Sequence, residues 1–265
     1  MKITALVENK SECELKAKHG LSLYIETDQH KILFDLGPDK TLFENAAKRQ
    51  IDLSAVDTVI ISHGHLDHGG GLGRFLEINK NADVYIQRKA FRRHTTKVLG
   101  IKFPCGIKET FKDHPQVHLL DGDYVIDDQL SLFTVKDKSA CYSTMNDALY
   151  EGKEKDNFDH EQHLIIQEGQ NNALIMGCGH SGVVNIMREA ADYHPALCIG
   201  GYHLMNPNSS KTVPEPILDQ IAEAMNGYPD TQFYTCHCTG ETAYNYLAAR
   251  VKNLSYLSCG KTVEC

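Results

Sequence analysis

The sequence predicts a layered α/β fold in which two β-sheets pack face to face and helices cover the outside. First, strand-like and helix-like segments alternate in both halves of the chain. Second, histidines and glycines follow several predicted strands, which places the candidate chemistry at strand ends. Third, hydrophobic residues make up 42% of the 265 residues, enough to fill a sizeable core. We therefore expect a single domain over residues 1–265.

Short apolar runs between polar segments predict the strands of the N-terminal half. The second and third runs are separated by TDQH, which suits a hairpin. A helical pattern follows Asp39, with Leu42 and Ala46 on one face, and GLGRFLEI predicts a second short helix. The strands predicted in this half are 2–8, 21–26, 31–36, 56–62, 83–87, 117–121 and 130–135.

The C-terminal half begins with a strand pair and then alternates helices with strands. The helix predicted over 214–227 has prolines near its start and ends at Gly227, which is typical helix punctuation. The other elements predicted here are strands 163–168, 172–177, 196–201, 231–236 and 253–258 and helices 183–193 and 241–250. This alternation favours a layered α/β architecture over an all-α or all-β one.

Two segments lack a clear period. Residues 88–115 are basic, and we expect a surface excursion there that could act as a lid over the site. Residues 137–160 form a second irregular segment.

Composition excludes several functional classes. The net charge of −8, without long runs of either sign, argues against a nucleic-acid-binding protein. No run approaches the roughly 18 apolar residues that a membrane-spanning helix requires. The N-terminus lacks the apolar region of a signal peptide, and nine cysteines, an odd number, fit reduced thiols. We therefore expect a cytoplasmic protein that acts on a small molecule.

The segment HGHLDHGGGL follows the strand-like run VDTVIIS and carries the strongest signal. It places His63, His65, Asp67 and His68 within six positions, and Gly64 allows the backbone to turn tightly between them. The spacing lets the first two histidines face one ion while the aspartate and the last histidine face another. Imidazole and carboxylate ligands suit zinc, manganese or iron. We therefore predict two adjacent divalent ions, with zinc preferred.

The HGHLDH motif after a hydrophobic strand resembles the signature of the metallo-β-lactamase fold superfamily. Other segments resemble one branch of it, the dihydropterin–aminobenzene-phosphate-synthase-like metallohydrolases. These segments are ALVENK, KHGLSLYIE, ILFDLGPD, SHGHLDHGGGL, MGCGHSG, IGGYHL and CHCTG. The resemblance implies a four-layer αββα sandwich of two mixed β-sheets, with a two-metal site at one edge between the sheets.

In that arrangement His63 and His65 would bind the first metal, and Asp67 and His68 the second. The remaining ligands must come from later strand ends. His180 and His237 each follow a predicted strand and carry the branch motifs, so we expect both to be ligands.

Three residues remain open as alternatives. The superfamily often has a bridging carboxylate at the end of the strand ALIMG, where this chain has Cys178 instead. The second site could therefore use this thiol, remain weak, or draw on His180. His160 and Glu161 precede the strand HLIIQE, where other branches keep a first-site histidine, and they are alternative ligands.

Further residues are expected to act on substrate. His203 lies at a strand end and could bind substrate or transfer a proton, and Asp67 could accept a hydrogen bond from the attacking water. Ser181 and Thr239 lie at predicted helix starts, which favour phosphate groups. Lys138 and the basic 88–115 segment could supply counter-charge. The histidines predicted to lie on the surface are His19, His30, His94, His114, His118 and His194.

The function predicted from these residues is a metal-dependent hydrolase that uses a metal-activated water, on a small phosphorylated or ester substrate. The name of the branch implies a narrower reaction, the joining of a pterin-methyl pyrophosphate to an aminobenzene ribosyl phosphate, which we do not transfer because one fold hosts many chemistries. Two alternatives are an iron-dependent redox enzyme of the same fold and a non-catalytic metal-binding protein.

Overall fold

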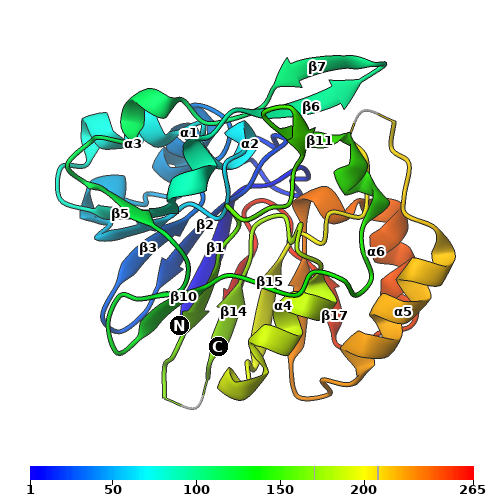
Figure 1. The fold of residues 1–265 in the computed structure, drawn as a ribbon. Helices are drawn as coiled ribbons and strands as arrows, with labels where there is room; N and C mark the ends of the chain where they lie inside the picture. Colours follow the sequence, from blue (N-terminus) through cyan, green and yellow to red (C-terminus); the bar gives the residue numbers. More distant parts are fainter. Residues whose placement is uncertain (170, 208) are drawn as a thin grey trace.

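The computed structural model describes residues 1–169, 171–207 and 209–265, and these fold into two large sheets packed face to face (Figure 1). Each large sheet has seven strands within the described residues. Helices cover the two outer faces, so the predicted αββα layering is confirmed. No helix in the described ranges has the length and apolar character needed to cross a membrane.

The first sheet has the strand order β18-β1-β2-β3-β4-β5-β8. Strands β3, β4, β5 and β8 run parallel to one another, and the remaining neighbours pair antiparallel. The bounds of its strands are β1 Lys2–Val7, β2 Ser22–Glu26, β3 Lys31–Phe34, β4 Thr58–Ile60, β5 Asp83–Gln87, β8 Val117–Leu120 and β18 Thr262–Glu264.

The second sheet has the order β17-β16-β15-β14-β13-β10-β9, and its strands β14 to β17 are parallel. The bounds of its strands are β9 Tyr124–Val125, β10 Leu130–Phe133, β13 His163–Ile166, β14 Ala173–Ile175, β15 Leu197–Gly200, β16 Gln232–Thr235 and β17 Leu254–Tyr256. Both sheets therefore mix parallel and antiparallel pairs, as predicted.

Alternate side chains of each strand face different layers because successive residues point to opposite faces. In β3, Ile32 and Phe34 pack between the sheets, whereas Leu33 packs under the outer helices. In β14, Ile175 faces the other sheet and Leu174 faces outward. The first sheet is covered by α1 Thr41–Lys48 and α3 Leu72–Ile78. The second is covered by α4 Val183–Glu189, α5 Glu215–Asn226 and α6 Glu241–Ala248.

The irregular structure predicted for 88–115 and 137–160 is found over only part of each segment. The two segments together form a third, four-stranded sheet in the order β12-β11-β6-β7, seen at the top of Figure 1. Its strands are β6 His94–Val98, β7 Ile101–Pro104, β11 Leu149–Glu151 and β12 Glu154–Lys155. All four residues of β7 are exposed, so this strand contributes nothing to the buried core by which the strands of the large sheets are recognised.

Parallel strands bring their carboxyl ends to one edge of the sandwich. The segments that follow β4, β14, β15 and β16 all meet there, and each carries at least one of the predicted site residues. This convergence follows from topology, since ligand sites in parallel sheets lie at the carboxyl ends of strands.

Candidate metal centre

The turn after β4 approaches its neighbours so closely that only glycine fits between the first two histidines. A Cβ atom on Gly64 would lie 2.4 Å from the carbonyl oxygen of Ala90 and 2.8 Å from Nε2 of His94. The chain then enters the short helix α2, Leu66–Gly69, which carries Asp67 and His68. Both residues therefore lie in the first turn after the histidine turn.

Three imidazoles converge on a first position. The Nε2 atoms of His63, His65 and His180 are buried and have no hydrogen-bond partner among the described residues. Ligand atoms of these three residues lie within 4.8 Å of one another. Unpaired buried nitrogens are costly, and three of them around one point are what an ion site requires.

Hydrogen bonds fix the tautomers of two of these rings. The Ser62 hydroxyl lies 2.7 Å from a carboxylate oxygen of Asp35, so its oxygen is left to accept from Nδ1 of His63 at 2.8 Å. Nδ1 of His180 lies 2.9 Å from the side-chain oxygen of Asn146. Both rings therefore carry their proton on Nδ1 and direct a lone pair from Nε2 toward the first position. Burial, followed by the neighbouring imidazoles, lowers the pKa of both rings well below the ordinary value.

A second group of donors lies beside the first. Nε2 of His68 is 3.2 Å from Nε2 of His237. The carboxylate of Asp67 lies 3.4 Å from Nε2 of His237 and 3.8 Å from Nε2 of His68. Donors held about 2.1 Å from a tetrahedral ion are roughly 3.4 Å apart, so these spacings fit a metal. The thiol sulfur of Cys178 is 3.1 Å from Nε2 of His68 and could join the set.

Asp35 controls the charge of the second group. It accepts from Nδ1 of His68 at 2.6 Å, and both side chains are fully buried. Burial by itself opposes protonation of His68, but the carboxylates of Asp35 and Asp67 outweigh it and raise the pKa of this ring to about 9. In the metal-free protein a proton therefore occupies the atom that a metal would use, and metal binding must displace it.

Two buried glutamates hold the loops that carry the distant ligands. Glu161 accepts the backbone N–H groups of His180 and Ser181, each at 2.7 Å. Glu8 accepts the backbone N–H of His237 and the hydroxyl of Tyr256, also at 2.7 Å each. His237 has a φ of 51°, a left-handed conformation that a non-glycine residue adopts at some cost. The carboxylate bonds secure this conformation.

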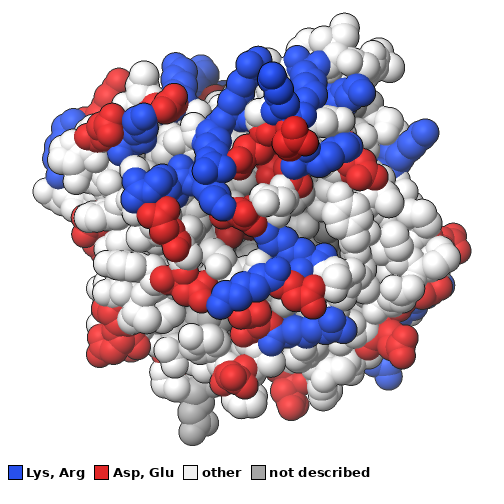
Figure 2. Space-filling model, viewed as in Figure 1, with Lys and Arg blue, Asp and Glu red and all other residues white. Residues whose placement is uncertain are grey.

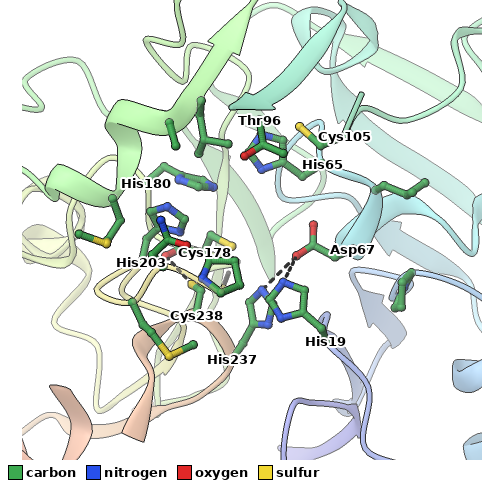
Figure 3. Close-up of a pocket in the computed structure, with 18 of the residues that line it drawn as sticks. His19, His65, Asp67, Thr96, Cys105, Cys178, His180, His203, His237 and Cys238 are labelled. Atoms are coloured by element: carbon green, nitrogen blue, oxygen red, sulfur yellow. Dashed lines mark hydrogen bonds and ion pairs between the residues drawn. The ribbon is translucent and has the colours of Figure 1, made fainter. Parts of the chain in front are cut away.

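A cavity of about 450 Å³ opens on both groups (Figure 3). Candidate ligands and apolar side chains line it together. The apolar lining residues other than cysteine are Pro38, Leu66, Pro104, Met145, Ala148, Leu149, Met205 and Pro207. Thr96 and Pro104 come from the segment 88–115 and Leu149 comes from 137–160, so both predicted excursions form part of the cavity wall.

His203, which we predicted to bind substrate or transfer a proton, lines the same cavity. Its ring centre lies 4.1 Å from that of His180, and its Nδ1 is buried without a partner among the described residues. Like His237, it has a left-handed backbone, with φ of 46°.

The other residues predicted to contact substrate lie elsewhere. Thr239 is fully buried, and its hydroxyl accepts from the backbone of Tyr202 and bonds Thr235. Ser181 is buried and does not line the cavity. Lys138 pairs with Asp159 at 3.1 Å, outside the cavity. None of these three predicted substrate contacts lines the cavity.

Part of the positive charge of 88–115 is neutralised by nearby carboxylates. Figure 2 shows Lys and Arg side chains interspersed with Asp and Glu on this face. Ion pairs join Arg88 to Asp121, Lys89 to Asp159, Arg92 to Glu151 and Lys112 to Glu109. Within the described residues, Lys18 is the single Lys or Arg that lines the cavity, so the predicted counter-charge from 88–115 is not found there.

Of the histidines predicted to lie on the surface, His19 is exposed as predicted but also belongs to the site region, whereas His94 is buried. His19 lines the cavity, and its Nε2 is 3.3 Å from the carboxylate of Asp67 (Figure 3). His94 is buried and bonds Asp156 at 2.9 Å. The signal for His19 is its place in KHGLSLYIE, one of the segments on which the resemblance rests. His94 has no comparable signal, because its partner lies 62 positions away.

Comparisons with known proteins agree with this geometry. The family model that describes the metallo-beta-lactamase superfamily matches residues 16–188. An uncharacterised protein of Methanocaldococcus jannaschii is 27% identical over 268 residues, covering 98% of this chain and 99% of its own. The 7,8-dihydropterin-6-methyl-4-(beta-D-ribofuranosyl)-aminobenzene-5'-phosphate synthase of the same organism is 24% identical over 276 residues, covering 94% and 90%.

A solved structure gives the same fold. The crystal structure of a metal-dependent hydrolase of the beta-lactamase superfamily matches with a TM-score of 0.83 at 23% identity. The match covers 100% of this chain and 99% of the other. The likeness extends over both sheets and over the edge where the histidines meet.

Proposed function

Because this chain belongs to the metallo-β-lactamase superfamily, we propose that it is a metal-dependent hydrolase acting on a small phosphorylated or ester substrate. One observation carries the proposal. Three unpartnered buried nitrogens, from His63, His65 and His180, face one point beside a second donor group, and a cavity opens on both. Divalent ions at these positions would supply an acidified water and a Lewis acid for the leaving oxygen.

The donor set supports two ions, with zinc as the preferred metal. His63, His65 and His180 would hold the first, and Asp67, His68 and His237 would hold the second, with Cys178 as an added donor. Neutral imidazoles leave the positive charge of the first ion uncompensated, which favours an anionic nucleophile. Mixed nitrogen, oxygen and sulfur donors are typical of zinc and iron and less suited to magnesium.

The remaining side chains would orient the reaction. Asp67 lines the cavity and can accept a hydrogen bond from the attacking water while it holds the second ion. His203 lies next to His180 with one ring nitrogen free, so it can donate a proton to a leaving oxygen. The apolar residues of the cavity lining suit a substrate whose reactive group is attached to an apolar body.

Cys178 favours one second candidate, an iron-dependent redox enzyme. Its sulfur lies among the second group of donors, and a thiolate ligand tunes iron potentials. The name of the related synthase suggests a third possibility, a synthase reaction in place of hydrolysis.

The test combines metal analysis with a substrate panel. Protein purified without chelators is analysed for zinc, manganese and iron, and then assayed against phosphodiesters, phosphomonoesters, thioesters and lactones. We expect zinc and turnover of at least one ester class, with turnover lost in His180→Ala and retained in His118→Ala. His118 is a matched control because it is exposed and bonds Asp83 at 2.7 Å. Iron with visible absorption would favour the redox candidate, and a metal-loaded protein inert toward the whole panel would count against hydrolysis.

A further inference from the structure

A third group of buried side chains lies next to the first metal position but does not line the cavity. It consists of His94, Asp156 and His160, which are 1%, 7% and 0% exposed. Together with His65, their possible ligand atoms lie within 4.8 Å of one another. A third metal site and a hydrogen-bonded network are both compatible with that spacing, and the hydrogen bonds decide between them.

The proton positions on His160 follow from its neighbours. The backbone N–H of Gly64 points at Nδ1 of His160, with a distance of 3.0 Å. Since an N–H group can only donate, Nδ1 must present a lone pair. A neutral imidazole with a bare Nδ1 carries its proton on Nε2, which lies 3.1 Å from a carboxylate oxygen of Asp156. A metal on Nε2 would have to remove this last proton, which leaves an unfavourable imidazolate.

His94 completes the network. Its Nδ1 lies 2.9 Å from the same oxygen of Asp156, and its Nε2 lies 3.2 Å from the carbonyl oxygen of Lys89. Both ring nitrogens thus face acceptors. The other oxygen of Asp156 accepts the backbone N–H of Phe158 at 2.8 Å. Every polar atom of the network has a partner without an ion, in contrast to the free Nε2 atoms at the first metal position.

We propose that Asp156 and His160 are positioning residues that hold the His63–Gly64–His65 turn in its metal-binding form. The hydrogen bonds that run from Asp156 through His160 reach the backbone N–H of Gly64. Gly64 lies between His63 and His65, two ligands of the first metal position. The same segment also supports the third ligand, because the Phe158 ring stacks on His180 at 4.4 Å and Glu161 binds its backbone. This inference rests on the proposed function, since it requires a metal at the first position.

The segment also links the site to the small sheet. Asp156 directly follows β12, its N–H donates to the carbonyl of Leu149 in β11, and its partner His94 begins β6. The small sheet therefore supplies one cavity wall and, through Asp156, the support beneath the first metal position.

The test uses two substitutions that separate a positioning role from ligation. His160→Ala removes the acceptor for Gly64. His160→Asn keeps an oxygen close to the former place of Nδ1, so it can still accept that N–H, but an amide is a poor ligand for a transition metal. Each variant is freed of metal and titrated with Co²⁺ against a chromophoric chelator, and the d–d spectrum of the first equivalent is recorded. His118→Ala is the control.

We expect the wild type to bind two Co²⁺ equivalents. In His160→Ala the affinity for the first equivalent should fall about 10–100-fold, as it does when residues that hydrogen-bond metal ligands are replaced. His160→Asn should recover most of the affinity and the wild-type spectrum. Equal loss in both variants, or a third equivalent that both variants lack, would make His160 a ligand and overturn the proposal. Unchanged affinity in His160→Ala would overturn it as well.

A measurement on the wild type keeps the test independent of variant folding. Long-range ¹H–¹⁵N spectra report which ring nitrogen carries the proton, and we expect the Nε2–H form of His160 with and without Co²⁺. Metal-induced loss of that proton would refute the positioning role. Failure of the wild type to bind any Co²⁺ would instead refute the proposed function, so the two failures are distinguishable.

Discussion

The proton on His68 should stabilise the metal-free protein and make its stability depend on pH. The ring is fully buried, bonds Asp35 at 2.6 Å and has a second carboxylate, Asp67, within 3.8 Å. Burial disfavours the imidazolium, but the two carboxylates outweigh this cost and raise the pKa to about 9 from an ordinary 6.5. The protonated folded state is therefore favoured over a wide pH range.

The sign and size follow from linkage between proton binding and folding. A pKa raised in the folded state gives a contribution that is fully present below pH 6.5 and disappears as the pH rises through about 9. At about 1.4 kcal/mol per pH unit, the His68 proton therefore contributes about 3 kcal/mol to the free energy of unfolding. Since native domains are stable by only about 5–15 kcal/mol, the effect should be readily measurable.

The assay is urea unfolding of chelator-treated protein at several pH values between 6 and 10. We expect the free energy of unfolding of the wild type to fall by about 3 kcal/mol relative to His68→Gln across this range. Asp35→Asn should reduce the dependence, and asparagine suits the left-handed backbone of residue 35, whose φ is 61°. His118→Gln should behave as the wild type does. A wild-type curve parallel to that of His68→Gln would refute the assigned protonation.

Three further predictions follow from the same contacts. Gly64→Ala places a Cβ atom 2.4 Å from a carbonyl oxygen, so urea unfolding should show a loss of about 1–3 kcal/mol, and an unchanged midpoint would contradict the tight turn. Glu161→Gln weakens two backbone bonds of 2.7 Å and should cost about 1–3 kcal/mol in thermal unfolding, whereas an unaltered Tm would show that the loop is held by other contacts. Chelation of the metal should lower the Tm, and re-addition of metal should restore it. When free metal exceeds its Kd about 100-fold, binding should add about 2.7 kcal/mol to the free energy of unfolding. A Tm that does not change with metal would argue against both ion positions.

Local sequence predicted the two large sheets because their central strands are buried on both faces. Strands β4, β14 and β15 are aliphatic runs whose residues are all buried, and such runs are recognisable without any partner. The small sheet lacks this property. Strand β6 pairs with β11, about 50 residues away, and its polar sequence HTTKV gives no hint of that pairing. Long-range pairing of short, polar strands is therefore the part of the fold that local pattern cannot supply.

The candidate ligands were predictable for a related reason. His63, His180 and His237 each follow a parallel strand closely, and strand ends of a parallel sheet meet whatever the intervening sequence. His19 and His94 do not follow such strands. They reach the site through a loop and through the small sheet, so their burial or exposure depends on distant residues such as Asp156.

The contrast between His180 and His160 shows what strand position leaves undetermined. Both are buried, both lie close to a strand of the second sheet, and both bond a group from a distant part of the chain through Nδ1. For His180 that group is the side-chain oxygen of Asn146, an acceptor, which keeps the proton on Nδ1 and frees Nε2 for an ion. For His160 it is the N–H of Gly64, a donor, so the ring proton lies on Nε2 and that atom has no lone pair for a metal. The chemical role of each histidine is thus decided by the partner of its far nitrogen, which only the folded chain brings into contact.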